Sequence, residues 1–224
     1  HWAVWNGFRL SQTTADAFSI RKRTHADRPW IGTFSGTRAP GYVFAGDVSG
    51  GLGVALKDFW QSYPTALQVD NAAARNARLT VWMWSPDAEP MDLRHYDNVA
   101  HDLEASYEDV QEGMSTPYGV ARTHTLTLVP SVAYGGKETV ARTAVMLAED
   151  APLLCTPEYL HAKHAFGVWS LPDRSNLKRA RVEDRLKDYL DYYVKAVDQH
   201  RWYGFWNYGD FMHTYDSVRH TCLL

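Results

Sequence analysis

The sequence contains little cysteine, no long hydrophobic run and no surplus of basic residues. Its two cysteines, Cys155 and Cys222, form neither a metal-binding nor a redox motif, and they would either pair or both be buried free thiols. No stretch approaches the roughly 18 consecutive apolar residues that span a membrane. The formal net charge of the 224 residues is −3, which excludes a general nucleic-acid binder. We therefore expect neither nucleic acid nor a membrane among the partners.

Several catalytic motifs are absent as well. The glycines of Gly50–Gly53 fit neither G-x-G-x-x-G nor G-K-[S/T], so a phosphate-binding loop is unsupported. No G-x-S-x-G elbow and no H-E-x-x-H motif occurs. Glu158, His161 and His164 follow one another at i, i+3 and i+6, which spreads them around a helix and favours a solvated face over a metal site. We expect no cofactor and no metal.

Aromatic residues, in contrast, are abundant. The chain holds nine Trp, thirteen Tyr and eight Phe, 13% of its residues. Some belong to the core of a packed protein, which the 45% hydrophobic content indicates. Trp and Tyr also stack on the apolar C–H faces of sugar rings. The composition therefore points to a carbohydrate ligand.

The chain from His1 to Asp150 has the pattern of a β protein. Short segments rich in Val, Thr, Leu and aromatic residues alternate with Gly, Pro, Asn and Asp. Many strands without helices between them predict an antiparallel sandwich. Within this part Val99–Glu112 alone has helical spacing. The predicted strands are Trp2–Leu10, Ala17–Thr24, Gly41–Ala45, Gly53–Lys57, Ala66–Val69, Leu79–Trp84, Gly119–Val129 and Glu138–Leu147.

After Asp150 the pattern becomes helical. Thr156 and Pro157 are typical of an N-cap followed by the first helical position. Ser175–His200 has an apolar stripe at i, i+3, i+4 spacing, which predicts one long amphipathic helix. Such a helix cannot bury its stripe alone, so further helices or docking on the sandwich must cover it. We divide the chain into a β-sandwich domain, 1–150, and a helical part, 151–224.

Four runs of residues carry the chemistry that a sugar-acting protein needs. The densest is Trp202–Asp216, too polar for a core and too aromatic for a solvent loop, and either a ligand-facing loop or a segment packed under neighbouring helices. Leu93–Asp97 sets Arg, His, Tyr and Asp in a row, and a surface turn is the alternative. If Arg122–Leu128 is a strand, Arg122 and His124 share a face with Leu126 and Leu128. A charge on this core face predicts a cleft at the end of the strand. The alternative is a core histidine whose hydrogen bonds are satisfied within the protein. Lys57 ends a strand beside Phe59 and Trp60, as a substrate contact or as half of a salt bridge.

The runs Gly51–Pro64, Leu93–Asp97, Gly119–His124 and Tyr203–Asp210 together resemble the exo-rhamnogalacturonan lyases of polysaccharide lyase family 26. The resemblance implies a mainly β protein: the family's central antiparallel β-sandwich followed by the first helices of its α/α toroid. It also implies that the chain, which begins at His1 without an initiator Met, is a truncated segment of a longer secreted protein whose flanking domains lie outside it. A segment of this kind need not be active as an enzyme on its own.

The reaction that the resemblance implies is β-elimination at galacturonic acid in rhamnogalacturonan or a related acidic polysaccharide. It needs a cation on the uronate carboxylate, a base for the C5 proton and often an acid for the leaving oxygen. Calcium is the cation in some lyases, but no oxygen-rich ligand loop stands out. By residue type, the cations are Lys57, Arg94 and Arg122, the bases His95, His124 and His213, and the acids Tyr96, Tyr208 and Tyr215. We assign catalysis to His213, Tyr208, Arg94, His95 and Lys57, and substrate binding to Trp206, Tyr203, Asn207, Asp210, Tyr215, Arg122 and His124.

Two other classes of function stay open. A non-catalytic carbohydrate-binding sandwich would use the aromatic residues as a platform. A glycoside hydrolase would use two carboxylates, such as Asp97 and Asp210, about 5 to 9.5 Å apart.

Overall fold

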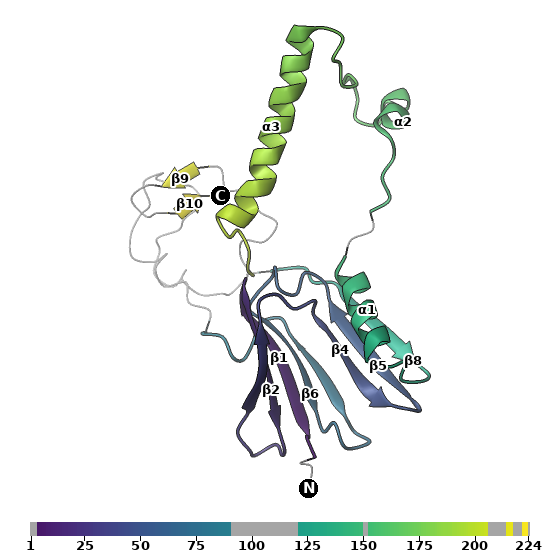
Figure 1. Cartoon of the computed structure of the whole chain (residues 1–224), viewed down its shortest axis with the longest axis vertical. Helices are drawn as coiled ribbons and strands as arrows, with labels where there is room; N and C mark the ends of the chain where they lie inside the picture. The colour runs from purple at the N-terminus through teal and green to yellow at the C-terminus, as the bar shows by residue number, and fades with distance from the viewer. Residues whose placement is uncertain (1–3, 91–120, 150–151, 206–213, 217–220, 224) are drawn as a thin grey trace.

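The computed structural model describes residues 4–90, 121–149, 152–205, 214–216 and 221–223, the last two ranges by their backbone alone. Two antiparallel sheets make up the sandwich (Figure 1). The first has the strand order β3-β2-β1-β6-β7, from β1 (Gly7–Thr14), β2 (Ala17–Arg23), β3 (Ile31–Gly36), β6 (Thr65–Asp70) and β7 (Arg78–Trp82). The second has the order β4-β5-β8, from β4 (Tyr42–Asp47), β5 (Gly50–Leu56) and β8 (Leu126–Ser131). A short separate ribbon pairs β9 (Thr214–Asp216) with β10 (Thr221–Leu223).

The core lies between the two sheets. Leu56, Phe59 and Leu67 are each 1% exposed, and Leu10 and Phe18 pack against them from the larger sheet. Gly41 has a φ of +73°, and a Cβ there would lie 2.1 Å from the Cβ of Phe59. Only glycine fits this position, since it alone tolerates both the backbone angle and the close approach. The antiparallel sandwich predicted from the sequence is confirmed.

Three helices follow the strands in the described residues: α1 (Lys137–Ala148), α2 (Pro157–Ala162) and α3 (Leu177–Gln199). The side chain of Thr156 accepts a hydrogen bond from the Tyr159 N–H at the start of α2, so the predicted cap is confirmed. The long helix is confirmed as α3, which begins after Asn176, whose side chain accepts from the N–H groups of Lys178 and Arg179. In Figure 1, α3 leads away from one end of the sandwich, and the start of β1 lies at the other.

The strand predicted at Glu138–Leu147 is wrong, because these residues form α1. Its Val and Thr residues favour strands locally, but Val140, Ala144 and Leu147 recur at helical spacing and form the less exposed side of the helix. Helix α1 contacts β4 and β5 and lies against the outside of the smaller sheet (Figure 1). The periodicity of 3.6 residues therefore outweighs the strand propensity of single residues.

Two further expectations about strands need correction. Residues 121–125 are irregular and β8 begins only at Leu126, so Arg122 and His124 precede the strand. Leu126 and Leu128 pair with the buried Leu56 and Val54 and share their face of the sheet, but they are 43% and 63% exposed because β8 is the edge strand. Pro130 fits such an edge, where a missing N–H is tolerated. Strand β3, another exposed edge strand, is absent from the sequence-based prediction.

The remaining fold expectations concern a helix and the cysteines. The helix predicted at Val99–Glu112 lies outside the described residues. Cys155 is a free and exposed thiol, so neither a pair with Cys222 nor a buried thiol at this position is observed. Its segment, between α1 and α2, has little packing around it, as the full exposure of Leu153 indicates.

Candidate active site

The segment that follows α3 is anchored on the end of the sandwich. The Gly204 N–H donates to the Gln61 carbonyl and the Phe205 N–H to the Tyr63 carbonyl, both at 2.6 Å. Trp202 and Tyr203 are 7% and 8% exposed. Gly204 has a φ of +117°, where a side chain is strained, and the Tyr63 ring lies 3.2 Å from the position of a Cβ. The chain therefore needs glycine to turn here onto the sandwich.

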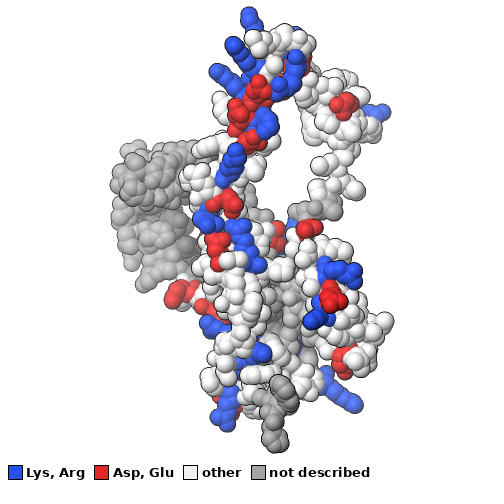
Figure 2. All heavy atoms as spheres, viewed as in Figure 1, with Lys and Arg blue, Asp and Glu red and all other residues white. Residues whose placement is uncertain are grey.

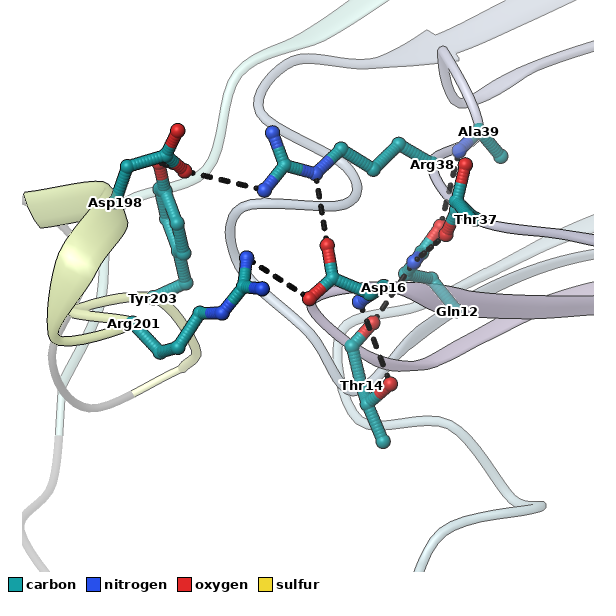
Figure 3. Close-up of polar contacts among 9 residues, drawn as sticks. All are labelled: Gln12, Thr14, Asp16, Thr37, Arg38, Ala39, Asp198, Arg201 and Tyr203. Carbon is teal, nitrogen blue, oxygen red and sulfur yellow. Dashed lines mark hydrogen bonds and ion pairs between the residues drawn. The ribbon is translucent and has the colours of Figure 1, made fainter.

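Ion pairs around Arg38 reinforce this anchor (Figure 3). Its guanidinium contacts Asp16 of the β1–β2 turn and Asp198 of α3, both at 3.2 Å. Arg201 reaches the other oxygen of Asp16 at 2.9 Å. Arg38 and Asp16 of the sandwich thus each pair with an opposite charge, from the last turn of α3 or from the residues just after it. The network ties the foot of the helix to the sandwich.

Aromatic rings complete the anchor. The Arg38 guanidinium lies 4.0 Å from the centre of the Trp60 ring, and the Trp60 and Tyr203 rings meet edge to face at 4.8 Å. The Tyr203 hydroxyl donates to Asp198 at 2.9 Å. Burial and this hydrogen bond raise the pKa of Tyr203, which keeps the hydroxyl protonated as a donor. Tyr203, a predicted sugar contact, is thus occupied by contacts within the chain, and its role in substrate binding stays a prediction.

Phe205, one residue further along, lies among three groups from the sandwich. Its ring centre is 5.4 Å from that of Trp84 and 6.0 Å from that of His124. Arg122 donates a hydrogen bond to the Phe205 carbonyl, and its guanidinium lies 5.9 Å from the ring centre. A weaker contact joins Arg122 to the Ser62 hydroxyl at 3.5 Å. Arg122 and His124, far from α3 in the sequence, therefore lie beside Phe205 of the Trp202–Asp216 run.

The pKa of His124 is lowered, first by burial of the imidazole and then by the positive charge of Arg122. Both effects disfavour the protonated ring. His124 is consequently neutral at neutral pH, and a neutral imidazole is able to accept a proton from a substrate. Arg122 keeps its charge at any physiological pH. The pair sets a proton acceptor next to a permanent cation.

Lys57 belongs to the same end of the molecule. Its backbone N–H donates to the Thr125 carbonyl at 3.0 Å, which extends the pairing of β5 with the β8 strand by one step. The fold thus brings together four predicted site residues from three separate runs: Lys57, Arg122, His124 and Tyr203.

The other predicted site residues are not described. Arg94, His95, Trp206, Asn207, Tyr208, Asp210 and His213 lie outside the described residues, as do Tyr96 and Asp97. Tyr215 lies in β9, of which the backbone alone is described. Among the residues that the structure describes, no group of three or more His, Cys, Asp and Glu side chains is placed to hold a metal ion. No described helix has the length and apolar character to cross a membrane.

Sequence reasoning did not find four residues that make contacts here: Arg38, Asp16, Asp198 and Trp84. Arg38 and Asp198 are separated by 160 positions, and a single arginine in a turn gives no local signal of its partner. Trp60 stands in the Lys57–Trp60 run, but its pairing with Arg38 became visible only in the folded chain.

The sequence matches two protein-family models. A family model described as the PcRGLX-like protein central beta sandwich domain matches residues 1–145. A second, the PcRGLX-like protein C-terminal alpha/alpha toroid domain, matches residues 150–222. The chain belongs to the PcRGLX-like family. Membership agrees with the resemblance to rhamnogalacturonan lyases at the level of the family, and it assigns α2 and α3 to a toroid domain.

Among curated proteins, the uncharacterized protein YetA of Bacillus subtilis (strain 168) is 38% identical over 218 residues. The match covers 97% of this chain and 25% of YetA, so the chain spans about a quarter of that relative's length.

Proposed function

We propose that this chain is part of a polysaccharide lyase that cleaves rhamnogalacturonan by β-elimination at galacturonic acid. The observation that carries the proposal is the neutral His124 beside the cationic Arg122, both next to Phe205 of the Trp202–Asp216 run. Membership of the PcRGLX-like family and the resemblance of four sequence runs support the same substrate.

The reaction dictates which groups are needed. A base removes the proton from C5, the electron pair forms the C4–C5 double bond, and the C4–O bond breaks. The leaving oxygen takes a proton, which an acid or water supplies. Because charge builds up on the uronate carboxylate during proton removal, a fixed cation beside it lowers the barrier.

The described residues fit two of these roles. His124 is the proposed base, since its lowered pKa keeps the ring unprotonated. Arg122 is the proposed cation for the uronate carboxylate, with Lys57 at the next strand position as a second candidate. Sugar binding is proposed for Trp206, Asn207 and Asp210, which continue the chain from Phe205. His213, Tyr208, Arg94 and His95 stay candidates for the remaining proton transfers.

The resemblance also motivates two further proposals, one on where along the polymer the protein acts and one on its location. Action from the end of the polymer would release small unsaturated oligosaccharides from the beginning of the reaction. Secretion is proposed because a cell-wall polysaccharide is too large to enter a cell intact.

A pair of matched histidine substitutions tests the proposal. The full encoded polypeptide that carries this chain is incubated with rhamnogalacturonan, and the ultraviolet absorbance of the unsaturated uronate is followed. His124→Asn should lower the rate roughly 100-fold or more, the usual contribution of a positioned base. His164→Asn is the control, because His164 is exposed after α2 and has a φ of +53°, which asparagine tolerates.

The outcomes separate the functional classes. A wild-type rate in His124→Asn removes His124 from the mechanism but leaves the lyase class standing. Oligosaccharide binding without any product supports a carbohydrate-binding module instead, and products without a double bond support a hydrolase.

A further inference from the structure

The outward face of the larger sheet is polar to an unusual degree. On the core face β1 and β6 set Leu10 opposite Leu67, and on the other face Arg9 stands between Arg21 and Gln68. Gln68 is only 5% exposed, although it faces away from the core. A sheet face that merely meets water does not bury its amide side chains, so this one is organised by its own contacts.

Those contacts form a connected network. Gln68 accepts hydrogen bonds from the Arg9 Nε at 2.8 Å and the Trp82 Nε1 at 3.2 Å, and donates to Asp70 at 2.7 Å. The Trp30 ring lies 4.5 Å from the Arg9 guanidinium and 4.4 Å from that of Arg23. The network fixes arginines and an indole ring in place before any ligand arrives, which reduces the entropic cost of binding.

A cavity of about 310 Å³ opens where this network ends. Its polar lining comes from the start of β1, the ends of β2 and β6, and the start of β7: Asn6, Arg23, Asp70, Asn71, Asn76 and Arg78. Asp70 is 6% exposed and holds both arginines, Arg23 at 2.7 Å and Arg78 at 3.2 Å. Two guanidinium groups against one carboxylate leave the cavity with one net positive charge.

The donors in the cavity are not saturated by the protein. The Arg78 side chain is 71% exposed. The Arg23 guanidinium already donates to Asp70 and to the Ala26 carbonyl, and its Nε is buried against Gly7, so Arg78 is the cation that a ligand can reach. Asparagine amides donate and accept at once, which suits hydroxyl groups. The set matches a ligand with a single negative charge and several hydroxyls.

We propose that this cavity is a second binding site, for a carboxylate-bearing sugar. The Arg78 guanidinium pairs with the carboxylate, and the three asparagines bind the ring hydroxyls. The proposal rests on the donor set of the cavity and not on the lyase reaction. A binding site here holds an acidic polymer to the sandwich without taking part in its cleavage.

The place of the cavity supports a tethering role. Asp70 ends β6, whereas Tyr63, which binds Phe205, precedes the start of that strand. The six residues of β6 span about 17 Å at a rise of about 3.4 Å per residue. The cavity and the candidate active site therefore lie at opposite ends of the sandwich, which sets several sugar units of a polymer between them.

Binding of galacturonate to the 224-residue chain tests the proposal. Isothermal titration and the indole signals of Trp30 and Trp82 report the binding of galacturonate, methyl galactoside and inorganic phosphate. Galacturonate should bind, with the neutral galactoside at least tenfold weaker. Arg78→Gln and Asn76→Ala should each weaken galacturonate at least fivefold. Arg28→Gln should leave binding unchanged, since Arg28 is an exposed arginine outside the cavity.

Unchanged galacturonate affinity in both cavity variants overturns the proposal. Phosphate binding as tight as galacturonate binding also overturns it, because the cavity is then a simple anion site. A lyase that cleaves short oligosaccharides normally after Arg78→Gln, but needs more polymer for half its rate, supports it. If the protein has no lyase activity but binds galacturonate, and Arg78→Gln weakens that binding, only the proposed reaction is refuted and the second binding site stands.

Discussion

At the scale of single residues, the proposed chemistry depends on the charge state of one histidine. Burial and the Arg122 guanidinium both lower the pKa of His124. A lowered pKa means that the ring loses its proton at a more acidic pH than a free histidine does. The proposed base therefore stays unprotonated over a wider pH range, and the proposed activity should fall only under acidic conditions.

Removal of the Arg122 charge should reverse part of this effect. In Arg122→Gln the pKa of His124 should rise toward its ordinary value, and the acidic limb of the pH–rate profile should move to higher pH by the same amount. Titration of the imidazole by NMR gives the pKa directly. Arg122→Lys keeps a positive charge and is the control. An identical His124 titration in Arg122→Gln and the wild type contradicts the electrostatic account.

Gly204 offers a second test at this scale. Gly204→Ala puts a side chain at a φ of +117°, and the strain should cost about 1–3 kcal/mol of unfolding free energy. Gly32→Ala is the control, because a Cβ at Gly32 meets nothing within 4 Å. Urea unfolding followed by tryptophan fluorescence measures both. Equal stability of the two variants shows that the turn onto the sandwich is not strained.

At the scale of elements, the foot of α3 is the feature that positions the site. Figure 2 shows charges of both signs along this helix, and Leu186, Tyr189 and Leu190 on it are about 60% exposed. Ala196, near its end, is 1% exposed. The helix is thus attached to the described sandwich at its last turn, where Arg38 and Asp16 meet it.

Arg38→Ala should loosen that attachment. The variant loses the stacking on Trp60 and the ion pairs to Asp16 and Asp198, with a stability cost of about 1–2 kcal/mol, mostly from the ring contact. Thermal unfolding and the near-ultraviolet circular dichroism of the aromatic cluster report the change. Arg174→Ala removes a comparable exposed ion pair to Asp184 at the other end of α3, and should have little effect. An equal effect of both substitutions argues against the anchor.

Elements with local signals were predictable from the sequence, and those with distant partners were not. Thr156 caps α2 through its own neighbour Tyr159, so a short pattern sufficed. Helix α1 carries Val and Thr residues that favour a strand, and only its helical spacing points to the observed helix. The convergence of Arg122 and Phe205 spans 83 positions, and only the folded chain brings them together.

At the scale of the whole molecule, the buried carboxylate of Asp70 couples stability to pH. Burial alone raises the pKa of Asp70, but hydrogen bonds from the two arginines and Gln68 outweigh it and lower the pKa overall. A carboxyl group whose pKa is lower in the folded state adds stability above its unfolded pKa. That stability disappears as the pH falls through the folded-state value.

Asp70→Asn should therefore remove part of the acid sensitivity. The variant should be about 2 kcal/mol less stable at neutral pH, because the paired arginines lose a charged acceptor, and the difference from the wild type should shrink as the pH falls. Urea unfolding at a series of pH values measures it. Asp27→Asn is the control, since Asp27 is 69% exposed. A constant difference between Asp70→Asn and the wild type at all pH values contradicts the linkage.

The proposed function requires the polypeptide carrying this chain to cleave rhamnogalacturonan by elimination rather than by hydrolysis. Mass spectrometry of the digestion products tests it most directly, because an eliminated uronate is lighter than a hydrolysed one by one molecule of water. We expect the lighter, ultraviolet-absorbing product, formed far more slowly by His124→Asn than by His164→Asn. Products that carry the full mass of hydrolysis, or polymer that is bound and left intact, would contradict it.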